Sequence, residues 1–159
     1  MKKYSSQPKI SRRRSGAALV EMACVLPVFV MFLFTLFEFA HFFMVQNLLK
    51  AATTEAARQG TVDGASTAQV QQRVNEIIGA ALDTSHVTVL VKDASVFDDP
   101  EVDATGIDYA GLSNIDLAAA ESRQLFLIRA EVDYHNVALF PPMWVANLRV
   151  TGQSVMRHE

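Results

Sequence analysis

The chain has 159 residues, of which 50% are hydrophobic and 19% are charged. A single cysteine, Cys24, excludes an intrachain disulfide, so a folded domain outside the cytoplasm must be held together by packing alone. The four histidines have no metal-ligand spacing, and the sequence has no phosphate-binding glycine loop or nucleophile elbow. Composition and motifs therefore indicate neither an enzyme nor a cofactor.

Charge is divided sharply along the chain. The first sixteen residues contain no acid and six bases: Lys2, Lys3, Lys9, Arg12, Arg13 and Arg14. Since the whole chain has 14 basic and 17 acidic residues, positions 17–159 retain 8 bases against 17 acids, a net charge of −9. A basic segment beside a membrane helix stays cytoplasmic, which predicts that the acidic remainder is translocated. An exported surface of this sign would repel phosphates, so nucleic acid is excluded as a partner.

An apolar run follows the basic segment. From Ala17 to Phe37 the only charged residue is Glu21, and apolar side chains continue beyond it. About 20 apolar residues span a bilayer, whereas the apolar core of a cleaved secretory signal has only about 7–15. The run therefore predicts a retained transmembrane helix over residues 17–45. Pro27 removes one backbone hydrogen bond and should bend its axis.

The same helix is predicted to continue into water. Leu48, Ala52, Ala56 and Gln59 form a narrow stripe of mostly small side chains, and Gly60 is placed to end the helix. A continuous helix over residues 17–59 would be about 65 Å long.

Glu38 and His41 lie three residues apart on one helical face, where the span should meet the far interface. Two interpretations stay open. The side chains pair with each other, or both reach headgroups and water.

The residues after the membrane helix, 46–159, are sufficient for one small domain. Ser66 and Gln69 have the spacing of a capping box, which predicts a helix that starts there and reaches about residue 82. Its apolar positions follow helical spacing and should be buried: Val70, Val74, Ile77, Ile78 and Leu82. From residue 61 onward the chain is expected to be soluble by itself.

Alternating and β-branched patterns predict strands over residues 86–92, 125–135 and 148–156, the last with a bulge at Gly152. A turn is expected at Pro141-Pro142. The prediction is an α+β, pilin-like fold, in which a long N-terminal helix accompanies a small antiparallel sheet backed by helices.

Residues 93–122 are acidic and are predicted to form a long surface loop, with a short helix over residues 115–123. Four carboxylates in this loop are candidate calcium ligands: Asp98, Asp99, Glu101 and Asp103. The run lacks the glycine and closing glutamate of a twelve-residue calcium loop, which favours a solvated acidic loop.

One segment carries a resemblance to a known family. Arg14-Ser15-Gly16-Ala17-Ala18-Leu19-Val20-Glu21-Met22-Ala23, then Leu26-Pro27-Val28, and Ala52 to Gly60 with its Ala56-Ala57-Arg58 stand in this order. Over residues 12–60 the chain resembles a TadE-like minor pseudopilin of the tight-adherence (Flp, type IVc) pilus systems of bacteria.

The resemblance implies a processing site and a location. Residues 1–16 would be a basic cytoplasmic leader that a prepilin peptidase removes after Gly16, leaving Ala17 as the new N-terminus. Glu21 would then be the fifth residue, where its carboxylate can neutralise the new ammonium in this subunit or a neighbour. The mature protein would cross the bacterial inner membrane once, with residues 46–159 in the periplasm.

The resemblance also implies partners and a function. The partners would be other pseudopilins, the major pilin and an inner-membrane assembly platform, and the subunit would support pilus assembly, adhesion and biofilm formation. The alternative is a single-span anchor that carries a periplasmic binding or sensory domain and keeps its leader.

Overall fold

The computed structural model describes residues 12–62, 64–99, 101–102, 106–145 and 147–159. Its helices are α1 (Arg12–Gly60) and α2 (Thr67–Gly79), and its strands are β1 (Thr88–Asp93), β2 (Leu125–Asp133) and β3 (Arg149–Arg157). The fold is the predicted one, a long N-terminal apolar helix with a small antiparallel sheet and a second helix. The chain divides into two compact units between Phe37 and Glu38.

The helix α1 starts earlier than predicted. It begins at Arg12 rather than at Ala17, since arginine and alanine are good helix formers and residues 12–18 contain no proline. It ends at Gly60, as expected, with Arg58 in its last turn. A Cβ atom at Gly60 would lie 3.2 Å from side-chain atoms of Leu117 and Phe126, so this glycine also makes room for the core.

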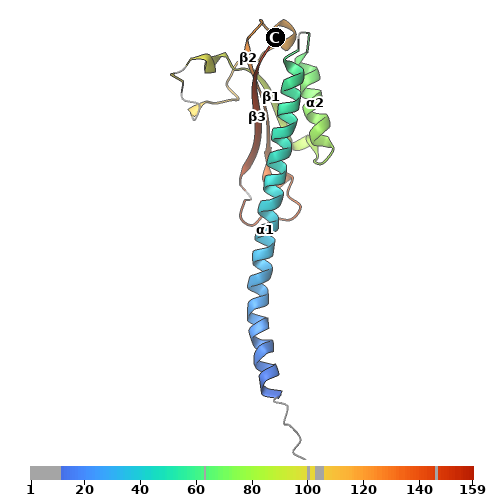
Figure 1. Cartoon of the computed structure of the whole chain (residues 1–159), viewed down its shortest axis with the longest axis vertical. Coiled ribbons are helices and arrows are strands. Elements are labelled where there is room, and N and C mark those ends of the chain that lie inside the picture. The colour runs from blue at the N-terminus through green and yellow to red at the C-terminus, as the bar shows by residue number, and fades with distance from the viewer. Residues whose placement is uncertain (1–11, 63, 100, 103–105, 146) are drawn as a thin grey trace, which may run out of the picture. The chain divides into compact units, whose positions relative to one another are not determined.

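The helix α2 has the predicted start and an earlier end. Ser66 caps it, and the capping box with Gln69 is complete in both directions. The helix ends at Gly79, short of residue 82, because glycine is a poor helix former and Ala80 provides the C-cap. Figure 1 shows α2 running beside the later part of α1, and an ion pair of 3.9 Å joins Arg73 to Glu55 across them.

The three strands form an antiparallel sheet in the order β1-β2-β3. Every predicted strand is present, and each end differs from its predicted position by at most two residues. The predicted bulge at Gly152 is wrong, because Gly152 pairs with Ala130 in the regular register of β2 and β3. A Cβ atom at Gly152 would instead lie 2.4 Å from the backbone carbon of Leu49, so the glycine lets β3 lie directly against α1.

The core lies between the helices and one face of the sheet. From α1 it takes Val45, Leu49, Ala52, Ala56 and Ala57. The predicted stripe is therefore rotated by part of a turn, since Leu48 is only half-buried and Gln59 is exposed. From α2 come Val70, Val74 and Ile78, and from β2 come Phe126, Ile128, Ala130 and Val132. A chain that began at residue 61 would lack the α1 part of this core. The expected solubility of that piece stays a prediction, and the packing of α1 argues against it.

The segment between β1 and β2 is more ordered than the predicted loop. Its described residues include the 3₁₀ turns η2 (Ser95–Asp98) and η4 (Leu117–Ala119), and η4 stands in place of the helix predicted over residues 115–123. Ile115 and Leu117 are buried in the core. The Lys92 ammonium donates to the Leu112 carbonyl and the Asn114 side chain, both at 2.9 Å. These contacts fix the segment to the edge strand β1.

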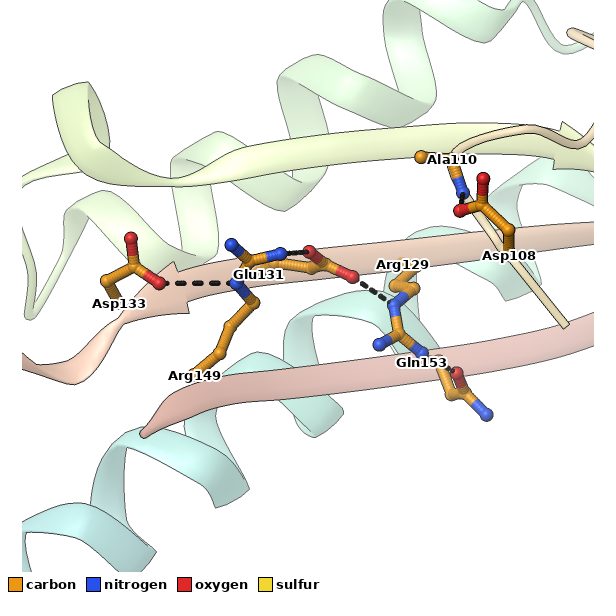
Figure 2. A network of polar contacts seen from close by, with 7 residues as sticks. All are labelled: Asp108, Ala110, Arg129, Glu131, Asp133, Arg149 and Gln153. Atoms are coloured by element: carbon orange, nitrogen blue, oxygen red, sulfur yellow. Dashed lines mark hydrogen bonds and ion pairs between the residues drawn. The ribbon is translucent and has the colours of Figure 1, made fainter. Parts of the chain in front are cut away.

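The other face of the sheet carries a polar network (Figure 2). Arg149 donates to Glu131 and Asp133 at 3.2 Å each, and Glu131 also binds Arg129. The hydrogen bond to Asp133 and its negative charge raise the pKa of Arg149. The Arg129 guanidinium also lies 4.3 Å from the ring centre of Tyr109. Because the side chains of Arg149 and Asp133 are well exposed to water, the ion pair between them contributes little to stability.

Candidate functional site on the N-terminal helix

The first part of α1 is apolar on every side. The large apolar residues from Leu19 to Phe37 are exposed on all sides of the helix, apart from the half-buried Leu33. A helix that is hydrophobic all round belongs in a protein core or in a membrane. Among the residues that the structure describes, the stretch Gly16–Gly60 holds the one helix that is long and apolar enough to cross a membrane.

Nothing in the described fold requires a glycine at position 16. Gly16 lies inside the helical backbone of α1, where glycine costs about 0.5–1 kcal/mol relative to alanine. A Cβ atom placed on it would meet nothing within 4 Å. Any requirement for glycine at this position must therefore come from something outside the described chain.

Glu21 is an exposed carboxylate on this apolar helix. No hydrogen bond or ion pair joins it to any residue in the described ranges. Ala17 is four residues earlier, which places it on the same face of α1, about 6 Å away along the helix axis. An ammonium group at Ala17 would therefore lie within reach of the Glu21 carboxylate.

Pro27 lies inside α1, as the sequence indicates, and the helix continues on both sides of it. Since proline has no N–H, the carbonyl of Ala23 loses its usual helical partner. The bend at Pro27 stays a prediction.

Glu38 and His41 have partners that neither sequence interpretation foresaw. The Glu38 Oε1 atom accepts hydrogen bonds from the backbone N–H groups of Trp144 and Val145, both at 3.0 Å. The hydroxyl of Tyr134 lies 3.2 Å from the Glu38 carbonyl oxygen and 3.0 Å from His41 Nδ1. Because the hydroxyl has one hydrogen, donating it to the carbonyl requires Nδ1–H of His41 to donate to the hydroxyl.

These contacts fasten α1 to the chain just before β3. Burial raises the pKa of Tyr134, and the negative charge of Glu38 raises it further. Sequence reasoning missed the arrangement because more than 100 residues separate Glu38 from Trp144. The one available signal was a carboxylate at the end of an apolar run.

The described part of the acidic segment, which leaves out residues 100 and 103–105, has no assembled cation site. Asp98 forms an ion pair with Arg157, and Asp99 accepts a hydrogen bond from the backbone of Glu101 at 3.0 Å. Asp103 lies outside the described residues. In the ranges that the structure describes, no three histidine, cysteine, aspartate or glutamate side chains gather as metal ligands.

The exposed apolar helix that precedes the α+β unit is typical of a single-pass membrane anchor. Comparison with known families then gives a more specific result: residues 16–58 match the family model described as TadE-like protein. This match confirms the resemblance to TadE-like proteins over residues 16–58 of the chain. The match begins at Gly16 and ends within the last turn of α1. No curated protein and no solved structure matches the chain.

Proposed function

We propose that the chain is a minor pseudopilin that takes part in assembling a tight-adherence pilus. Residues 17–45 hold it in the bacterial inner membrane, residues 1–16 form a cytoplasmic leader, and residues 46–159 form a periplasmic domain. The observation that carries the proposal is Glu21, a carboxylate without a partner among the described residues and the only charged residue from Ala17 to Phe37. It stands five residues after Gly16, which the fold does not require.

Removal of the leader after Gly16 supplies the missing partner. Cleavage removes all six leader cations and creates an ammonium at Ala17, on the face of α1 that carries Glu21. A buried charge is tolerated in lipid when an opposite charge compensates it, whereas an unpaired one is costly. The pair forms within one subunit or with the N-terminus of a neighbour during assembly.

The partners follow from this role. A prepilin peptidase cuts the leader, and an inner-membrane platform moves the mature subunit toward other pseudopilins and the major pilin. Adhesion and biofilm formation are the expected consequences of the assembled pilus.

The intact mass of the membrane-bound form tests the proposal. With the peptidase present, we expect the mature chain to begin at Ala17 and the Gly16→Leu variant to stay uncut. Gly106→Leu is a matched control, since Gly106 also has open space around it and lies outside α1. An intact leader on the wild-type membrane form, with active peptidase, would contradict the proposal. That result would favour the alternative of an anchored binding or sensory domain.

A further inference from the structure

The compact unit that begins at Glu38 exposes an apolar loop. We call residues 139–144, between the 3₁₀ turn η5 (Tyr134–Asn136) and β3, the apolar loop. Leu139 is 72% exposed, Met143 66% and Trp144 58%, and Phe140 is exposed as well. No charged residue occurs between His135 and Arg149, although residues 17–159 carry a net charge of −9. A charge-free apolar surface of this kind marks a contact with lipid or protein.

The apolar loop is held in place rather than loosely attached. Its last residue, Trp144, and the following Val145 both donate backbone hydrogen bonds to Glu38. The Val145 side chain is buried in the core, and Leu148 N–H donates to the Val145 carbonyl at 3.1 Å. The base of the loop is therefore fixed to the domain, while the apolar side chains of the loop stay exposed.

The anchor also fixes the level of the loop along α1. Glu38 directly follows the uninterrupted apolar run that ends at Phe37, and it lies about two helical turns before the end of the proposed span at residue 45. It therefore lies near the outer end of the span. Since the Trp144 nitrogen is 3.0 Å from the Glu38 carboxylate, the loop backbone lies at that same level. Exposed apolar side chains on the neighbouring turns of α1, Phe39, Phe43 and Met44, belong to the same end of this unit.

From Pro141 to Val145, every backbone position apart from Met143 has either no N–H group or one that is already hydrogen-bonded within the protein. Pro141 and Pro142 carry no N–H, and the N–H groups of Trp144 and Val145 are taken by Glu38. Backbone donors without partners are what lipid tolerates least. Tryptophan is enriched at membrane interfaces, where its ring meets the acyl chains and its N–H meets the headgroups.

From these observations we propose that the apolar loop inserts into the outer leaflet beside α1 and binds the lipid interface as a second membrane contact. The proposal rests on the retained membrane span of the proposed function. The loop and α1 together give the domain two points of attachment, which fixes its rotation about α1. Leaving the membrane for a pilus then requires this loop to leave the lipid.

Trp144 is the only tryptophan in the chain and reports on its own surroundings. The full chain is reconstituted into vesicles of phosphatidylcholine and phosphatidylglycerol whose acyl chains are brominated either near the headgroup or near the methyl end. We expect strong quenching of Trp144 fluorescence by the shallow bromines, weak quenching by the deep ones, and shielding from acrylamide.

A matched pair of variants separates the loop from general effects of surface mutation. The double variant Leu139→Ser/Met143→Ser removes exposed apolar side chains but keeps Trp144 and the core. It should lose most of the lipid quenching and gain acrylamide quenching. The double control Val62→Ser/Val155→Ser changes two other exposed apolar residues, which lie outside the loop, and should behave as wild type.

Flotation of the vesicles tests the membrane span separately from the loop contact. If the protein floats with the vesicles but neither brominated lipid quenches Trp144, the loop contact is overturned and the membrane span stands. If the protein fails to float, the span and the loop proposal both fall.

Discussion

The two halves of α1 show how one helix serves two surroundings. Residues 17–37 carry bulky apolar side chains on every side, and those side chains are mostly exposed. Residues 38–60 instead bury a stripe that includes Leu49, Ala52 and Ala56 against the sheet. Bulky residues fill a lipid surface well, whereas small residues let two backbones approach closely. Side-chain size along α1 therefore indicates which half meets lipid and which half meets protein.

Truncation within α1 should produce the largest effect. A piece spanning residues 38–159, kept in mild detergent, should unfold cooperatively, and a piece spanning 61–159 should not fold. Burial of a valine or leucine stabilises a domain by about 1.5–3 kcal/mol, whereas the total free energy of unfolding is only about 5–15 kcal/mol. Loss of Val45, Leu49 and the small residues after them would also uncover Phe126 and Ile128. Near-ultraviolet circular dichroism during thermal unfolding measures the difference. A cooperative transition in the 61–159 piece would contradict the two-part description of α1.

The next largest effect is expected from Glu21→Gln, in the lipid half. The variant keeps the size of the side chain and removes its charge, so insertion and cleavage should proceed. Assembly should fail, because the Ala17 ammonium loses its partner and breaking a buried pair costs about 3–5 kcal/mol. Crosslinking to other pseudopilins and the yield of surface pili measure assembly. Cys24→Ser, on the same apolar stretch, should be nearly silent. Normal piliation by Glu21→Gln at normal protein level would rule out the charge pair.

In the protein-packed half, Gly152→Ala should be strongly destabilising. The added methyl group would lie 2.4 Å from the Leu49 backbone carbon, so a strand or a helix backbone must shift. Overpacking of this kind costs about 1–3 kcal/mol, and more where the backbone cannot move. Gly79→Ala, whose Cβ would lie at an ordinary 3.5 Å from Thr84, is the matched control and should be neutral or stabilising. Denaturant unfolding of the full chain in detergent compares them, and equal stability of the two variants would refute the close approach of β3 and α1.

The smallest effect concerns the junction of the two halves, where the Tyr134 hydroxyl meets Glu38 and His41. Tyr134→Phe should lower the free energy of unfolding by about 1 kcal/mol at neutral pH, the usual contribution of a hydrogen bond. Because burial and Glu38 raise the pKa of Tyr134, the folded state favours the neutral phenol. The stability that the wild type gains over Tyr134→Phe is then complete below pH 10.0, the ordinary pKa of tyrosine. It declines as the pH rises through the raised pKa of Tyr134. Unfolding curves from pH 8 to pH 11 test this, with Tyr109→Phe as the control. An advantage that grows with pH would contradict the assignment.

The sequence was sufficient for the features that rest on local patterns. The long apolar helix, the Ser66–Gln69 capping box, the three strands and the TadE-like segment all depend on residues close together in the chain. Features that depend on distant pairs were missed. The role of Gly152 requires knowing that Leu49 lies against it, and the partners of Glu38 come from residues 144 and 145.

The stripe on α1 illustrates the same limit. Leu48 and Leu49 are equally apolar, and only the direction of approach of the sheet determines that Leu49 is the buried one. Leader removal at Gly16, the charge pair at Glu21 and the bend at Pro27 depend on a peptidase, a neighbour or a membrane, and they remain predictions.

Accessibility of the single cysteine tests the central claim most directly. Cys24 lies in the apolar half of α1 and is exposed in the protein itself, so only lipid would shield it. In nanodiscs, where both membrane faces are open, a charged maleimide should fail to label Cys24 until the lipid is dissolved in detergent. A Cys24→Ser/Ala51→Cys variant moves the thiol to an exposed position in the other half of α1 and should be labelled in both conditions. Labelling of Cys24 in intact nanodiscs as fast as the thiol at position 51 would contradict the account.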